Sequence, residues 1–131
     1  MKQRLSIARA FATNPEILLM DEPFAALDEQ NKLLMQQELA ALWEEFRSTV
    51  IFITHSLDEA VLLGDRVVVM SSAPGRIIHS MDIGLARPRQ SDDIRHMPDF
   101  VRSTSELWEL LGREVLEARR QEAERIGKQA R

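Results

Sequence analysis

Two adjacent carboxylates at the end of a short apolar run are the residues best placed to do chemistry. Asp21 and Glu22 follow Ile17-Leu18-Leu19-Met20 and precede a proline. The apolar run predicts a buried strand, and open α/β folds bind ligands at the carboxyl ends of such strands. There, one carboxylate can hold Mg²⁺ through its water shell and a second can polarise an attacking water. A polar turn after the strand explains the same pair equally well.

A histidine and a third carboxylate occur at comparable boundaries. His55 closely follows the apolar, β-branched run 49–53, and its imidazole can donate a hydrogen bond to a phosphate oxygen. The alternative is a histidine that orders the strand-to-helix turn. If the two strands are parallel, His55 lies at the same sheet edge as Asp21 and Glu22. Asp28 precedes a helical pattern, and a helix N-cap accounts for it.

The hydrophobic pattern predicts alternating elements that position these residues. We expect helices at 2–13, 29–47 and 56–63, and strands at 16–20, 49–53, 66–70 and 76–83. The succession of strand, helix, strand, helix and strand is typical of a parallel sheet, and the strand at 49–53 is expected to be parallel and central because it is apolar on both faces. The alternating pattern at 76–83 predicts an antiparallel partner strand after the turn at 73–75. Ser56 and Glu59 fit a capping box, and Gly64 fits the end of the same helix.

The last third of the chain has a weaker pattern. A polar connector that contains Arg87-Pro88-Arg89 is expected at 86–97, and Pro98 begins a last helix. After Arg119 the residues are mostly charged, so we expect a frayed or disordered end. One stripe of this helix is predicted to pack against the rest of the chain, namely Trp108, Leu111, Val115 and Ala118.

Composition excludes several classes of function. The 131 residues contain no cysteine and carry a net charge of −4, which excludes disulfides and thiolate metal sites and gives no support to a nucleic-acid partner. His79 and His96 have no partner at metal-ligand spacing and are predicted to be structural or surface residues. No apolar stretch approaches the roughly 18 residues of a membrane span, and no signal-peptide pattern occurs. We therefore expect any link to a membrane to go through a partner.

In combination, these segments resemble the C-terminal part of an ABC transporter ATP-binding subunit. The match has four parts in order: Lys2–Ala10 resembles the helix after the LSGG signature, Ile17–Glu22 the Walker B strand with its catalytic glutamate, Ala25–Asp28 the D-loop, and Thr54-His55 the H-loop. A narrower similarity links three segments to the nitrate, sulfonate and taurine importer ATPases: Ile53–Arg66, Ser72–Ile77 and Arg87–Arg89. That similarity argues against an ABC ATPase outside transport.

The resemblance implies a fold, cofactors and residue roles. The fold would be the C-terminal part of a P-loop NTPase, a mostly parallel sheet flanked by helices with a C-terminal helical extension. The cofactors would be ATP and Mg²⁺. Asp21 would help to hold Mg²⁺ through water, Glu22 would act as general base, and His55 would contact the γ-phosphate. Asp28 would act across a head-to-tail dimer, near the nucleotide of the second ATPase subunit.

The same resemblance implies an organisation and a location. The ATPase part would cover 1–85, a linker 86–97, and the C-terminal helix with its charged tail 98–131. Transmembrane permease subunits would be the other partners, with no nucleic acid and no direct membrane span. The protein would be cytoplasmic and peripheral, on the inner or plasma membrane.

The sequence lacks the family's Gly-rich phosphate-binding loop and its LSGG signature. Phosphoryl transfer depends on positioning and charge stabilisation, so we expect the chain alone to be inactive. We also expect exposed apolar faces and an open strand edge. The alternative function is a non-catalytic dimer-interface module that modulates intact ATPase subunits. A truncated or frameshifted gene, a split gene, a deliberate fragment and a misassigned start codon all fit the sequence.

Overall fold

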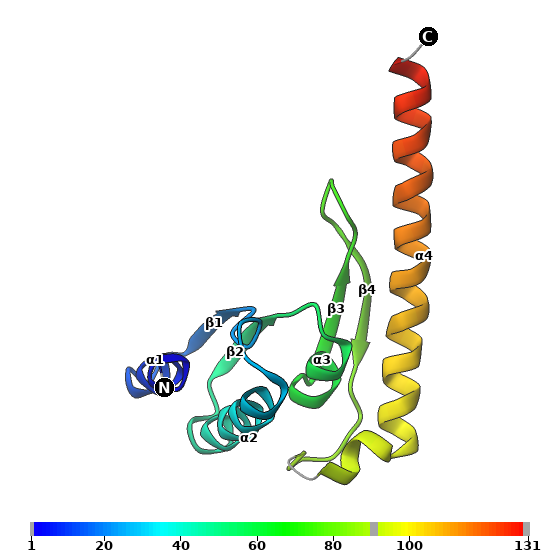
Figure 1. Ribbon diagram of the computed structural model, residues 1–131. Coiled ribbons are helices and arrows are strands. Elements are labelled where there is room, and N and C mark those ends of the chain that lie inside the picture. The colour runs from blue at the N-terminus through cyan, green and yellow to red at the C-terminus, as the bar shows by residue number, and fades with distance from the viewer. Residues whose placement is uncertain (1, 90–91, 130–131) are drawn as a thin grey trace.

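The structure, a computed structural model, describes residues 2–89 and 92–129. Its elements follow in the order α1 (Lys2–Ala12), β1 (Ile17–Asp21), α2 (Glu29–Phe46), β2 (Thr49–Ile53), α3 (Leu57–Leu63), β3 (Arg66–Met70), β4 (Ile77–Asp82), a 3-10 helix η1 (Asp92–His96) and α4 (Pro98–Gln129). The helices and strands predicted before residue 86 are confirmed to within one residue at each end. Figure 1 shows α3 between a part built from α1, α2, β1 and β2 and a part built from β3, β4 and α4.

The strands form two separate pairs. β1 and β2 are parallel, with Ile17 opposite Thr49 and Asp21 opposite Ile53. β3 and β4 are antiparallel, which confirms the prediction for the strand at 76–83. The prediction of one mostly parallel sheet is therefore wrong for the described residues, which contain two sheets of two strands. β3 pairs with the strand that follows it after a short turn, because a local hairpin costs little loop-closure entropy.

One face of the parallel pair is covered and the other is bare. Helices α1 and α2 cover the face that carries Met20, and Phe24 from the following loop completes this core. On the opposite face Leu19 is 72 % exposed, and Ile17, Ile51 and Ile53 are each more than half exposed. The prediction that β2 is a central strand is thus wrong for the described residues, whereas its parallel pairing and the expected exposure of an apolar face are confirmed. The reason is the strand period of two, which turns alternate side chains away from the helices.

A second core joins α3, β3, β4, η1 and α4 (Figure 1). The stripe predicted to pack from α4 is wrong in part, since Trp108 is 71 % exposed and Val115 is also exposed. The helix instead buries Phe100 and Leu107, with Leu111 partly buried beside them. Successive residues of a helix are rotated by roughly 100°, so Trp108 points well away from the face that buries Leu107.

Helix α4 continues well past the residue where we expected order to end. It runs to Gln129, so the expected fraying after Arg119 is wrong for the described residues, and residues 130–131 lie outside them. The segment 120–129 is rich in arginine, glutamine and glutamate, which are good helix formers. In addition, Arg120 Nε lies 3.5 Å from Glu124 Oε1, one helical turn away.

No helix in the described part of the chain combines the length and the apolar character that crossing a membrane requires. α4 is the longest, and its sequence is rich in charged residues.

Candidate functional site

Glu22 and His55 meet at the carboxyl edge of the parallel pair. Glu22 directly follows β1, and His55 comes two residues after the end of β2. His55 Nε2 lies 2.6 Å from Glu22 Oε1. The histidine side chain is 88 % exposed and the glutamate side chain 35 % exposed. The parallel register thus brings together two of the predicted site residues in a place open to solvent.

The backbone at Glu22 is held in an uncommon conformation. Its φ of 45° lies in the left-handed region, which costs a residue with a Cβ about 1–3 kcal/mol and clusters at functional sites. The Glu22 backbone N–H donates to the Ile53 carbonyl at 2.8 Å, which extends the β1–β2 pairing by one step. The carboxylate is therefore aimed by the sheet and the turn together.

Asp21 occupies the last position of β1, opposite Ile53 of β2. Its side chain is exposed, and it forms no ion pair with another residue of the described segments. No three histidine, aspartate or glutamate side chains gather into a metal-binding cluster within residues 2–89 and 92–129. One exposed carboxylate fits a hydrated Mg²⁺, because this ion keeps most of its waters and takes few protein ligands.

Asp28 caps helix α2 in the structure. Its Oδ1 accepts from the Asn31 backbone N–H at 2.8 Å, and its Oδ2 accepts from Asn31 Nδ2 at 3.0 Å. The N-cap interpretation of this residue is confirmed. The structure does not bring Asp28 to Glu22 or His55, and its proposed action across a dimer stays a prediction.

We expect Asp28→Ala to lower the free energy of unfolding by about 1 kcal/mol, because it removes the acceptor for the Asn31 N–H. Asp28→Asn keeps an acceptor at this position and is the matched control, with a loss of only a few tenths of a kcal/mol expected. Urea unfolding followed by circular dichroism measures both. Equal stability of the alanine variant and the parent chain would contradict the cap.

The loop between Glu22 and α2 is anchored on the core. Phe24 is buried, and its ring centroid lies 5.7 Å from that of Phe52 on β2. Gln3 Nε2 of α1 donates to the Pro23 carbonyl. Gln3 thus ties α1 to this loop. The loop that follows the two carboxylates is therefore held in place both by the core, through Phe24, and by α1, through Gln3.

Glu59 differs from its predicted role. In a capping box its carboxylate would return to the Ser56 backbone N–H, but that N–H is bonded to Thr54 Oγ1 instead. Only half of the box forms, with Ser56 Oγ accepting from the Glu59 N–H at 3.3 Å. The Glu59 carboxylate is buried and accepts from Thr54 Oγ1 at 2.6 Å and from Gln36 Nε2 at 3.3 Å. In the sequence, only the position of Glu59 shortly after His55 could have indicated that its carboxylate lies close to the candidate site.

Arg87 and Arg89, which we expected in a polar connector, are hydrogen-bonded to elements of the second core. Arg89 is 5 % exposed, and its guanidinium donates to four backbone carbonyls, those of Val61, Gly64, Ile83 and Leu85. Burial lowers the pKa of Arg89 below its ordinary value, and repulsion from Arg87 adds to this. Arg87 donates to the Leu63 carbonyl at 2.6 Å and lies over the Trp43 ring at 4.4 Å. These arginines hold the chain after β4 against α3.

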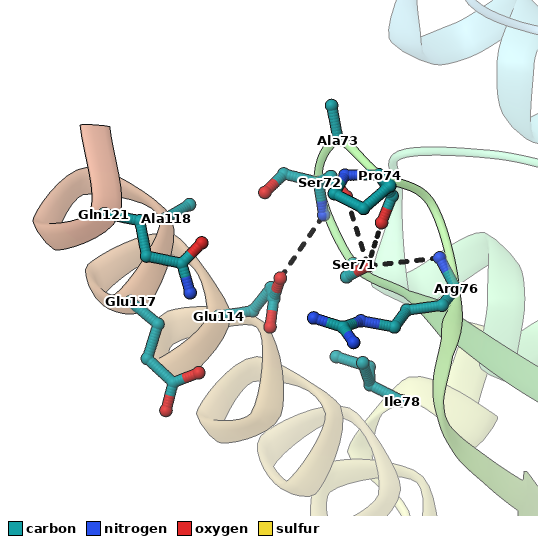
Figure 2. Close-up of a pocket in the computed structure, with 10 residues that line it drawn as sticks. All are labelled: Ser71, Ser72, Ala73, Pro74, Arg76, Ile78, Glu114, Glu117, Ala118 and Gln121. Atoms are coloured by element: carbon teal, nitrogen blue, oxygen red, sulfur yellow. Dashed lines mark hydrogen bonds between the residues drawn. The ribbon is translucent and has the colours of Figure 1, made fainter. Parts of the chain in front are cut away.

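A shallow hollow of 150 Å³ lies between the β3–β4 turn and α4. None of the site residues predicted from the sequence lines it. Figure 2 shows that the Ser71 hydroxyl and the Ser72 N–H are already bonded within it. The Ser72 N–H donates to Glu114 Oε1 at 3.3 Å, and Ser71 Oγ accepts from the Arg76 N–H at 3.1 Å. These bonds tie the turn to α4 and leave few groups for a ligand.

Comparison with known proteins shows which family the sequence is related to. The chain is 48 % identical over 118 residues to an uncharacterized ABC transporter ATP-binding protein of Methanocaldococcus jannaschii, which covers 90 % of this chain and 43 % of the relative. The chain is homologous to ABC transporter ATP-binding proteins. No protein-family model matches it.

Two further relatives are import ATP-binding proteins by name. The taurine import ATP-binding protein of Rhizobium johnstonii is 44 % identical over 115 residues, which covers 85 % of this chain and 44 % of that protein. The nitrate import ATP-binding protein of Synechococcus elongatus is 44 % identical over 114 residues, which covers 86 % and 42 %. The predicted resemblance to ABC ATP-binding subunits is confirmed. The chain spans less than half the length of these relatives.

Proposed function

We propose that the chain forms the Walker B, D-loop and H-loop part of a P-loop ATPase that energises an ABC importer. The contact of His55 with Glu22 at the carboxyl edge of β1 and β2 carries this proposal. This contact supports a site in which a base, Glu22, and a hydrogen-bond donor, His55, lie together at the ends of two parallel strands. The exposed Asp21 is next to them in the sequence. The homology to ABC ATP-binding proteins supports the same assignment.

In this proposal each residue has a separate task. Asp21 helps to hold Mg²⁺, which neutralises phosphate charge when bound. Glu22 takes a proton from the attacking water. His55 donates to the terminal phosphate, so it must leave Glu22 when nucleotide binds, and its high exposure permits that motion. Asp28, at the start of α2, faces a second ATPase subunit in a head-to-tail dimer.

The partners follow from the importer assignment. We infer permease subunits in the membrane and a peripheral position on its cytoplasmic face. The exposed apolar face of the β1–β2 pair supports association with another polypeptide that covers it. It equally supports the second candidate function, a non-catalytic module that associates with intact subunits.

The isolated 131-residue chain is expected to bind ATP negligibly and not to hydrolyse it. Its residues include no Gly-rich loop with lysine to hold the phosphates, and charge stabilisation by such a loop dominates phosphoryl transfer. Titration calorimetry with ATP and Mg²⁺ and a phosphate-release assay measure both. Mg²⁺-dependent hydrolysis by the purified chain would contradict this expectation.

Co-expression separates the two candidate functions. A polypeptide that supplies the phosphate-binding loop and the LSGG signature should regain ATPase activity in the presence of the chain, and a Glu22→Gln copy of the chain is the matched control. Dose-dependent inhibition of an intact subunit, without restored activity of the loop-bearing polypeptide, would replace the enzymatic proposal by the module.

A further inference from the structure

A chain of hydrogen bonds connects the C-terminal segment to the turn that carries His55. Arg95 on η1 donates to Gln36 Oε1 of α2 at 3.1 Å. Gln36 Nε2 donates to Glu59 Oε1 of α3, and Thr54 Oγ1 donates to Glu59 Oε2. The turn is closed by the Ser56 N–H, which donates to Thr54 Oγ1 at 2.9 Å. His55 lies between Thr54 and Ser56, so its backbone is held from both sides.

Burial makes this chain of bonds specific. Gln36 is 3 % exposed and Glu59 is 5 % exposed. A buried polar group costs free energy unless it is bonded, so each of these side chains depends on its neighbour. The Gln36 amide must present its oxygen to Arg95 and its nitrogen to Glu59, which leaves one of its two orientations. Arg95 is also paired with Asp58 of α3 at 3.0 Å, which fixes its guanidinium.

We propose that Arg95 is a positioning residue for His55, acting through Gln36, Glu59 and Thr54. The segment after the second sheet thereby sets the orientation of the histidine that contacts Glu22. A shift of η1 would free the Gln36 amide to turn, loosen the Glu59 carboxylate and release the Thr54–Ser56 turn. The catalytic meaning of this link rests on the proposed function, but the link itself is a property of the chain without nucleotide.

The test is made on the full 131-residue chain by nuclear magnetic resonance, without ATP. Arg95→Gln should change the imidazole ¹⁵N shifts of His55 and speed amide exchange at Ser56 by about 3- to 10-fold, as expected for one weakened hydrogen bond. Arg95 is partly exposed, so this variant should stay folded. Arg102→Gln, which removes an exposed arginine of α4, is the matched control and should leave both signals unchanged.

A charge-exchange variant distinguishes positioning from general packing. Glu59→Gln alone should disturb His55. The side-chain amide nitrogens at positions 36 and 59, the Thr54 hydroxyl and the Arg95 guanidinium then share only two amide oxygens as acceptors. Combining it with Gln36→Glu gives every donor an acceptor again: Arg95 and the amide at position 59 both donate to the carboxylate at position 36, and Thr54 donates to the amide oxygen. The double variant should recover the His55 shifts and the slow exchange of Ser56.

Two results would overturn the proposal. One is an Arg95→Gln chain with parent-like His55 shifts and Ser56 exchange. The other is a folded double variant that is no closer to the parent than a folded Glu59→Gln. Should Glu59→Gln not fold, the Arg95→Gln arm decides. Because no nucleotide is used, failure of the ATPase experiments leaves this result standing, and the reverse holds as well.

Discussion

Replacing Glu22 by glutamine should lower ATP turnover by roughly 100- to 10,000-fold in an assembly that supplies the phosphate-binding loop, the range that general-base catalysis contributes. Glutamine has nearly the same shape, and its amide oxygen can still accept from His55 Nε2, which lies 2.6 Å from the carboxylate in the parent chain. The amide cannot take a proton from water, so binding of ATP should persist while hydrolysis is lost. Phosphate release and equilibrium ATP binding separate the two effects.

Glu45→Gln is the matched control for this experiment. Glu45 is an exposed carboxylate near the end of α2 and belongs to neither core. Its neutralisation changes the net charge by the same amount and should leave turnover at the parent level. Undiminished hydrolysis by Glu22→Gln would remove the general-base role from this residue.

The second large effect is expected at Arg89, on stability rather than turnover. Arg89→Met should lower the free energy of unfolding by about 3 kcal/mol, because it leaves carbonyls of α3 and of the chain after β4 without their donor. Removing the desolvated charge, whose burial lowers the pKa of Arg89, offsets part of this loss. Urea unfolding of the 131-residue chain measures the difference.

Arg102→Met provides the comparison for Arg89. Arg102 pairs with Asp99 one turn earlier in α4, and its side chain is largely exposed. Exposed pairs of this kind contribute about 0–1 kcal/mol. A loss at Arg89 no larger than that at Arg102 would show that the buried guanidinium does not hold the chain after β4 in place.

Local sequence determined the elements up to residue 86. Apolar runs of β-branched residues and a proline after Asn14 placed the strands and ended the first helix. These predictions held because period and capping act over a few residues, independently of distant parts of the chain. The register of β1 against β2 is a property of the folded chain, and it brings Glu22 to His55.

Burial on helix faces was less predictable. On α1, Leu5 is exposed, whereas the neighbouring apolar residues Ile7 and Phe11 are buried. On α4, Leu107 and not Trp108 faces the core. A periodic stripe defines candidate faces, but the neighbouring elements decide which face is covered.

The sequence by itself determined the identity and order of the chemical groups, Asp21, Glu22, Asp28 and His55, and the strands that carry them. Only the tertiary structure decided that β3 and β4 form a sheet separate from β1 and β2, that Arg89 is buried with its guanidinium on backbone carbonyls, and that Arg95 reaches Gln36 across 59 positions of sequence. The physical reason is the range of the interactions. Strand period and helix caps are set by neighbours in sequence, whereas buried hydrogen bonds form wherever folding brings an unpaired donor and acceptor together.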